Sequence, residues 1–214
     1  MKKIQGSSIA KRISPERLER LKVSFLFASV MLVSVALGML VASRISDGLY
    51  ANSIFRLSTH FETVFLKGSH AAECAKIVAR YAIADIVSLL VIFAASFSML
   101  NYLITDAVLL YNGAKLGISA TFLINFSTRH DFSYTLGNAR VLVFIIIELA
   151  LASLILYYSY QAAAASIGFK KTVSNGRPDI KSGDFFSFLL KTAACVGAVF
   201  ILNALYCFLL YILK

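Results

Sequence analysis

Charged residues are scarce in this chain of 214 residues. Only 15% of the residues are charged, whereas 59% are hydrophobic, and the mean hydropathy is +0.78. Soluble globular domains usually carry about 25% charged residues. The scarcity of charge argues against a soluble domain and predicts a membrane protein.

Cysteine is also scarce. Cys74, Cys195 and Cys207 are the three cysteines, and two of them lie within apolar runs. Secreted proteins that rely on disulfides are short and rich in cysteine. We therefore expect no disulfide framework.

The sequence motifs of common enzymes are absent. The chain has no H-E-x-x-H, G-x-x-x-x-G-K-[ST], G-x-G-x-x-G or G-x-S-x-G motif, which mark metalloproteases, nucleotide-binding proteins and hydrolases. The three histidines, His60, His70 and His130, fall outside the apolar runs, whereas an intramembrane serine protease would need one inside a span. We expect no catalytic residue, no metal and no cofactor.

Five apolar runs are each long enough to cross a membrane. A spanning helix needs about 20 apolar residues, because the hydrocarbon core is roughly 30 Å thick and a helix rises 1.5 Å per residue. The sequence therefore predicts an all-α, polytopic helical membrane protein with about five transmembrane helices. Their expected ranges are 23–43, 81–105, 107–128, 141–168 and 185–213. Four or six spans stay open, and residues 101–106 offer the place for a tight turn between the second and third runs.

Basic residues gather at the ends of the apolar runs and give the chain a net charge of +10. Seven of them lie in the arm of residues 1–22, which places the N-terminus in the cytoplasm by the positive-inside rule. Residues 23–214 form a single helical membrane domain in this interpretation, with Lys214 outside. This distribution predicts a multi-pass protein of the cell membrane that contacts membrane lipids and binds no nucleic acid.

The segment of residues 47–80 would lie outside the cell. Its apolar residues recur at helical spacing and its other face is polar, which predicts an extracytoplasmic amphipathic helical segment. Such a segment can lie on the bilayer, dock on a partner or pack on the protein's own spans. The apolar positions are Ile54, Leu57, Phe61, Val64 and Phe65.

The third run contains the stretch NGAKLG, which is unusual in a segment that crosses lipid. Asn112 and Gly113 favour a turn, so we expect the helix to bend or break there. Lys115 must pair or face other helices, since an ammonium group at the bilayer centre costs about 3 kcal/mol. The other charges within the runs are Asp85, Asp106, Glu148 and Lys191.

Glu148 could pair with Lys115, or with Lys191 if the depths match. We therefore predict an intramembrane charge pair among Lys115, Glu148 and Lys191. One interpretation is a proton or ion path, and the other is a structural pair that fixes the helices.

Small residues at a spacing of four occur in two of the runs. Gly113 and Gly117 form a G-x-x-x-G pair, and Ser34, Gly38 and Ala42 repeat the spacing in the first run. Small residues let helices approach closely in membranes. Together with Asn112 they are the predicted helix-packing or partner-binding residues.

The stretch LLYNGAKLGISATFLINF resembles the NG…LG element of the stage II sporulation protein M family of polytopic membrane proteins. The matching residues are Asn112, Gly113, Leu116 and Gly117. The order of features is also similar: a basic start, a span, an outside amphipathic stretch and then a helical hairpin. The resemblance implies a non-enzymatic membrane component that anchors cell-wall-degrading partners at the septal membrane of a spore-forming bacterium during engulfment.

The leading hypothesis is thus a membrane scaffold whose partners are other integral membrane proteins, cell-wall hydrolases among them. The alternative is a small transporter or channel subunit with a midplane site near Asn112, Lys115 and Glu148. The sequence leaves the oligomeric state open.

Overall fold

The computed structural model describes five helices and the turn between two of them. The helices are α1 (Pro15–Ile45), α3 (Ala71–Ala95), α4 (Asn101–Arg129), α6 (Ala139–Ser174) and α7 (Ser182–Ile212). Residues 1–14, 46–70, 130–138, 175–181 and 213–214 lie outside the described part. No strand occurs among the described residues, which confirms the all-α prediction.

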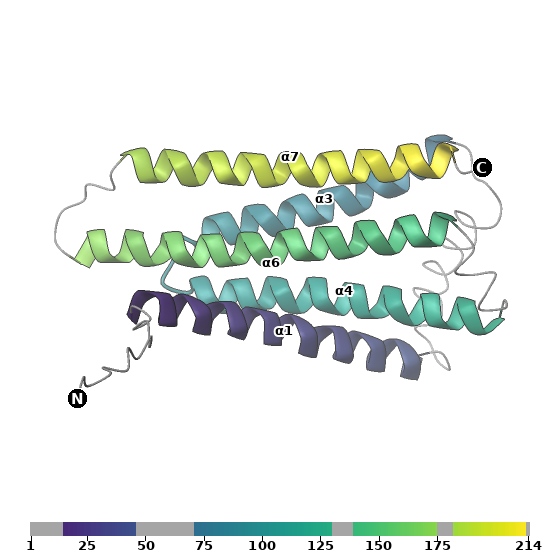
Figure 1. The fold of residues 1–214 in the computed structure, drawn as a ribbon, viewed down its shortest axis with the longest axis horizontal. Helices are drawn as coiled ribbons and strands as arrows, with labels where there is room; N and C mark the ends of the chain where they lie inside the picture. The colour runs from purple at the N-terminus through teal and green to yellow at the C-terminus, as the bar shows by residue number, and fades with distance from the viewer. Residues whose placement is uncertain (1–14, 46–70, 130–138, 175–181, 213–214) are drawn as a thin grey trace, which may run out of the picture.

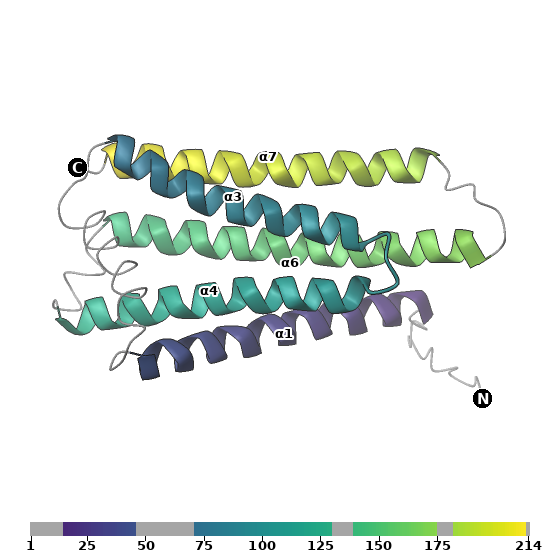
Figure 2. The same ribbon diagram turned by 180° about the vertical axis from the view of Figure 1, so that it is seen from behind.

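The five helices lie side by side and alternate in direction along the chain (Figures 1 and 2). At one edge α1 packs mainly on α4, and at the other edge α7 packs on α3 and α6. The helix α4 contacts α1, α3 and α6. It therefore has neighbours on several sides, and this is where the polar residues of the third run lie.

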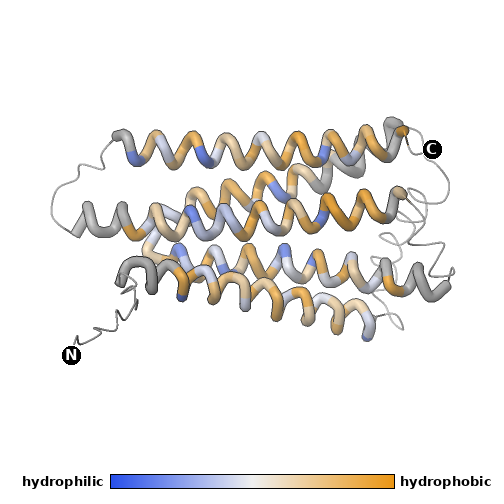
Figure 3. Tube along the Cα trace, in the orientation of Figure 1, coloured by the Kyte–Doolittle hydropathy of each residue, from blue (hydrophilic) through white to orange (hydrophobic). Residues whose placement is uncertain are grey.

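Three helices are long and apolar enough to cross a membrane. They are Leu21–Arg44 in α1, Leu142–Ile167 in α6 and Asp184–Leu209 in α7, and α3 adds the shorter apolar stretch Ala82–Ala95. Hydrophobic residues predominate along the described helices (Figure 3), and large apolar side chains such as Leu32, Ile146 and Phe200 are exposed. Such a surface fits a lipid environment rather than water.

Every helix contributes to the apolar core. Tyr158 of α6 is fully buried, and its hydroxyl lies 2.7 Å from the Thr192 hydroxyl of α7. The Tyr158 ring stacks on Phe188 at a centroid distance of 6.1 Å, and Phe188 stacks on Phe93 of α3 at 5.4 Å. This aromatic stack joins α3, α6 and α7. The other large buried apolar residues are Phe27, Leu89, Ile92, Leu109, Ile155 and Val199.

The turn between α3 and α4 lies at residues 96–100, earlier than the predicted 101–106. Ser98 lies within this turn, and its Oγ accepts a hydrogen bond from the Leu100 amide at 3.1 Å. Asn101 is completely buried and its Oδ1 accepts a hydrogen bond from Thr105 at 3.1 Å. The polar residues that suggested a turn are thus part of the first turns of α4.

The predicted outside segment 47–80 falls only partly within the described residues. Residues 47–70 lie beyond them, as does the part of the basic arm up to residue 14. From Ala71 onward the chain belongs to α3, which continues without interruption into the apolar stretch.

Candidate functional site: the two faces of helix α4

The stretch NGAKLG presents two faces of one helix to two different neighbours. Residues three or four apart share a face of a helix. Gly113 and Gly117 lie against α1, whereas Asn112 and Lys115 reach α3. Asn112, the glycines and the ammonium group therefore occur close together in the sequence because α4 packs between two helices. The contact with α1 requires small residues, and the contact with α3 is made by polar side chains.

The glycine face brings the backbones of α1 and α4 into direct contact. A Cβ on Gly117 would collide with the Val35 carbonyl oxygen and the Met39 amide nitrogen, and a Cβ on Gly113 would collide with Ser34. Such collisions with backbone cannot be relieved by rotating a side chain. Glycine is needed here for close approach rather than for an unusual backbone angle.

The small residues of α1 lie on the same interface. A Cβ on Gly38 would collide with the backbone of Ala114, and Ser34 and Ala42 are buried, with exposed fractions of 1% and 5%. Thr121 donates a hydrogen bond to the Gly117 carbonyl of its own helix at 3.1 Å. The two small-residue sets predicted from the sequence are therefore brought together within one chain. They do not form a free surface for another protein's span.

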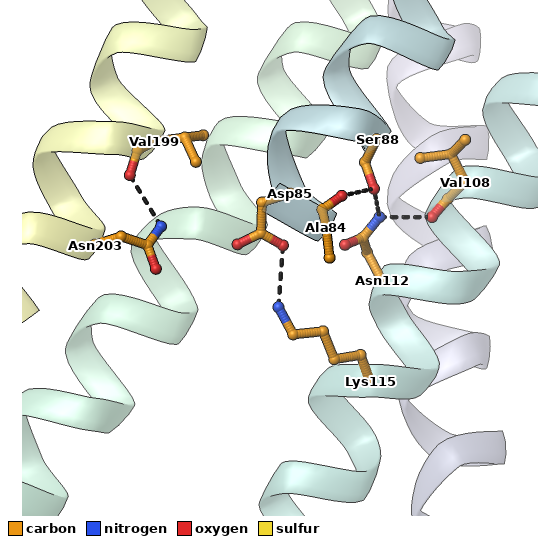
Figure 4. A network of polar contacts seen from close by, with 8 residues as sticks. All are labelled: Ala84, Asp85, Ser88, Val108, Asn112, Lys115, Val199 and Asn203. Carbon is orange, nitrogen blue, oxygen red and sulfur yellow. Dashed lines mark hydrogen bonds and ion pairs between the residues drawn. The ribbon is translucent and has the colours of Figure 1, made fainter. Parts of the chain in front are cut away.

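The polar face holds an ion pair. Lys115 Nζ lies 3.0 Å from Asp85 Oδ1, and the two side chains are 16% and 1% exposed. Buried charges in a membrane protein avoid most of their desolvation cost only when they are paired. This pair fixes α3 against α4 (Figure 4).

Asn112 adds a second bond between the same helices. Its Nδ2 donates to Ser88 Oγ at 3.2 Å and to the Val108 carbonyl at 2.9 Å. Ser88 in turn donates to the Ala84 carbonyl at 3.0 Å (Figure 4). The amide is therefore held both by its own helix and by the neighbouring one.

The expected break at Asn112 and Gly113 is not present, because α4 is continuous from Asn101 to Arg129. The Asn112 amide bonds back to the preceding turn instead of initiating a new one. Gly113 is buried against α1, so tertiary packing offsets its low helix propensity. The transporter interpretation relied on a discontinuous helix to form its midplane site, and α4 is not discontinuous.

The structure brings only part of the predicted charge pair together. Glu148 of α6 is partly buried and interacts electrostatically with Lys115 and Asp85. Lys191 lies elsewhere: it is exposed on α7 and its Nζ donates to Gln161 Oε1 at 3.4 Å. The hydrogen-bonded partner of Lys115 is Asp85, a charge of the second run whose pairing was not predicted from the sequence.

The register of the hairpin explains why Asp85 was missed. Three residues back along α3, from Ser88 to Asp85, correspond to three residues forward along α4, from Asn112 to Lys115. With a turn at 101–106, Lys115 would instead face a residue about two helical turns further along α3. A correct placement of the turn was the signal that could have revealed the pair.

No group of three or more metal-ligating side chains occurs among the residues that the structure describes. The described polar contacts between α3 and α4 involve one carboxylate, one ammonium group, one amide and one hydroxyl. Such a set can hold paired charges and can tie helices together.

The chain matches no protein-family model, and no curated protein or solved structure is similar to it.

Proposed function

We propose that this protein crosses the cell membrane five times, with its N-terminus in the cytoplasm and its C-terminus outside, and serves as a non-enzymatic scaffold. The alternating directions of the five helices support the five crossings. The shortest, α3, has 25 residues, which at 1.5 Å per residue gives about 38 Å and exceeds the roughly 30 Å hydrocarbon core.

The charges of α3 and α4 are compatible with two of these crossings. Asp85 and Lys115 face each other between the helices and do not face lipid. A paired charge in a bundle interior is the usual way in which a spanning helix carries an ionisable residue. The charges of Asp85 and Lys115 are therefore no obstacle to a crossing by α3 and α4.

The scaffold proposal is supported by two observations: α4 is held tightly to its neighbours at the centre of the bundle, and the outer helices α1 and α7 expose large apolar side chains. Glycine contacts lock α1 to α4, and the ion pair and the amide lock α3 to α4. At the edges, α1 and α7 keep large exposed apolar side chains, among them Leu32, Leu40, Phe200 and Phe208. A fixed bundle with two free helix faces suits the binding of other spans.

The resemblance to the stage II sporulation protein M family supplies the partner class. We propose that the partners are integral membrane proteins that remodel the cell wall, held at the septal membrane during engulfment. The glycines of the NG…LG element would then serve to pack the bundle, since they are buried in the contact with α1. The partner-binding faces would be the outer faces of α1 and α7.

Site-specific photo-crosslinking in native membranes tests the scaffold. A photoreactive amino acid would replace Leu32 or Leu40 on α1, or Phe200 or Phe208 on α7, with Ile146 on α6 as an equally exposed control. We expect mass spectrometry to identify other integral membrane proteins crosslinked to α1 or α7, and only lipid adducts at Ile146. Lipid adducts alone at all five positions would contradict the scaffold.

Reporter fusions test the five crossings separately. Alkaline phosphatase is active only outside the cytoplasm, and green fluorescent protein exported in unfolded form is dark. Fused after Lys214, the phosphatase should be active and the fluorescent protein dark, whereas four or six spans would reverse both results. A fusion in residues 175–181 should give the opposite pattern and serves as the internal control.

A further inference from the structure

Lys115 and Lys191 both lie within the predicted apolar runs, but their surroundings differ. Lys115 of α4 is paired with Asp85 at 3.0 Å. Lys191 of α7 is exposed, and its described contact is a hydrogen bond to the neutral Gln161 of α6 at 3.4 Å. A bond of that length is weak, and an ammonium group has three N–H donors. Lys191 therefore keeps most of its capacity to bind an anion.

No carboxylate pairs with Lys191 among the residues that the structure describes. On α7 the preceding carboxylate is Asp184, seven residues and about 10 Å away along the helix. On α6, Glu148 lies thirteen residues before Gln161, which is about 20 Å along the helix. The described helices thus supply Lys191 with no negative charge.

The depth of Lys191 places its charge near the lipid headgroups. The apolar stretch Asp184–Leu209 has 26 residues and is about 39 Å long. If a hydrocarbon core of roughly 30 Å is centred on this stretch, the Lys191 backbone lies about 6 Å inside the boundary of the core. Helical side chains tilt toward the helix N-terminus, which is the nearer end of α7. The long stem of the lysine therefore carries the ammonium group toward that boundary.

Gln161 extends the same site from the neighbouring helix. It lies six residues before Ile167, the end of the apolar stretch of α6. Because α6 and α7 are antiparallel (Figures 1 and 2), Gln161 and Lys191 lie at about the same depth. The Gln161 Oε1 accepts the bond from Lys191, which leaves the N–H donors of the amide for another acceptor. The two side chains together offer the donors that a phosphate group requires.

The sequence at the same end of these two helices is basic. Between Ile167 and Asp184 it has four basic residues and one acidic residue. An excess of positive charge at a membrane surface attracts anionic lipids. A zwitterionic lipid would instead bring a second cation close to Lys191.

We propose that Lys191 and Gln161 bind the phosphate group of an anionic phospholipid where α6 meets α7. The phosphate oxygens accept hydrogen bonds from the ammonium group and from the amide. The acyl chains run past Tyr157, which is exposed one turn deeper on α6. This site rests on the membrane crossings proposed above for α6 and α7, and in the proposed orientation the lipid lies in the cytoplasmic leaflet.

Quenching of a single tryptophan by brominated lipid tests this site in the full chain. The sequence contains no tryptophan, so Tyr157→Trp introduces a unique reporter beside the site. Ile146→Trp, at an exposed position of the same helix, is the control reporter. Each variant is reconstituted in phosphatidylcholine vesicles with either brominated phosphatidylglycerol or brominated phosphatidylcholine at the same mole fraction. At Tyr157→Trp we expect the anionic lipid to bind about fivefold more strongly, as for one basic residue near an anionic surface, and at Ile146→Trp we expect no preference.

Second substitutions in the Tyr157→Trp chain identify the group that binds the lipid. Lys191→Gln should remove the preference and Lys191→Arg should retain it, whereas Lys22→Gln, at an exposed lysine of α1, should leave it unchanged. Equal quenching by the two lipids, or a preference that survives Lys191→Gln, would overturn the lipid site alone. Absence of quenching by either lipid at both reporters would contradict the membrane crossing of α6 as well. Loss of the preference when inorganic phosphate is added at constant ionic strength would show that the site takes free phosphate instead.

Discussion

The two interfaces of α4 hold their neighbouring helices by opposite means. Toward α1 the contact consists of small residues, with Gly113 and Gly117 against backbone atoms. Toward α3 it consists of an ion pair and an amide bond, from Lys115 and Asn112. The residues of both interfaces alternate within six positions of one helix. Lipid supplies no hydrophobic drive for helix association, so a membrane bundle needs either close packing or interhelical polar bonds, and this helix uses one on each side.

The difference has consequences for how each interface responds to change. Close packing against backbone tolerates no added atom, because nothing nearby can rotate away. A polar contact between side chains can adapt, by protonation or by a new partner. The glycine interface should therefore fail sharply and the polar interface gradually.

The largest effect is expected from Gly117→Leu. The new side chain would collide with Val35 and Met39 backbone atoms, and we expect a loss of at least about 3 kcal/mol in the free energy of unfolding, the upper end for overpacking. Unfolding in mixed micelles with increasing sodium dodecyl sulfate would measure it. Gly197→Leu on α7 is the matched control, because an added Cβ there meets no described atom within 4 Å. Equal effects at the two positions would refute the packing argument.

Lys115→Met should have the next largest effect, about 2 kcal/mol near neutral pH, which is within the range for leaving a buried polar group without its partner. It removes the partner of a carboxylate that is 1% exposed, and an unpaired buried charge is strongly destabilising. The same denaturation assay at neutral pH measures the loss.

A double variant distinguishes the contribution of the two charges from the contribution of side-chain packing. Asp85→Asn combined with Lys115→Met removes both charges, and we expect it to recover most of the stability that Lys115→Met loses. Without such recovery, the cost would come from the packing of the lysine stem rather than from the charge.

The helices themselves were largely predictable from the sequence. Runs such as residues 23–43 and 141–168 are long and apolar, and length and composition suffice to indicate a helix there. The small residues at Ser34 and Gly38 also carried a signal for close packing. Their partner could not be predicted, because a motif of small residues does not say which helix will approach it.

The candidate site was harder to predict because it depends on register. Residues 96–106 contain serine, asparagine and threonine at several positions, and composition alone does not show which of them turns the chain. The hydrogen bond from the Leu100 amide to Ser98 decides it. Once the turn is displaced, Asp85 no longer faces Lys115. A local preference such as that of Asn112 and Gly113 for a turn was likewise overridden by packing on both sides of α4.

The smallest of the expected effects tests the polar interface at its weaker bond. Asn112→Leu removes the hydrogen bond to Ser88, and we expect a loss of about 1 kcal/mol, within the range measured for interhelical hydrogen bonds in membranes. The loss should be small because Ser88 still donates to the Ala84 carbonyl and is not left without a partner. Asn203→Leu is the matched control, since that buried amide bonds to Val199 of its own helix. If both variants lose the same amount in the mixed-micelle assay, the bond between α3 and α4 contributes nothing beyond what a bond within one helix contributes, and the ion pair alone holds the polar interface.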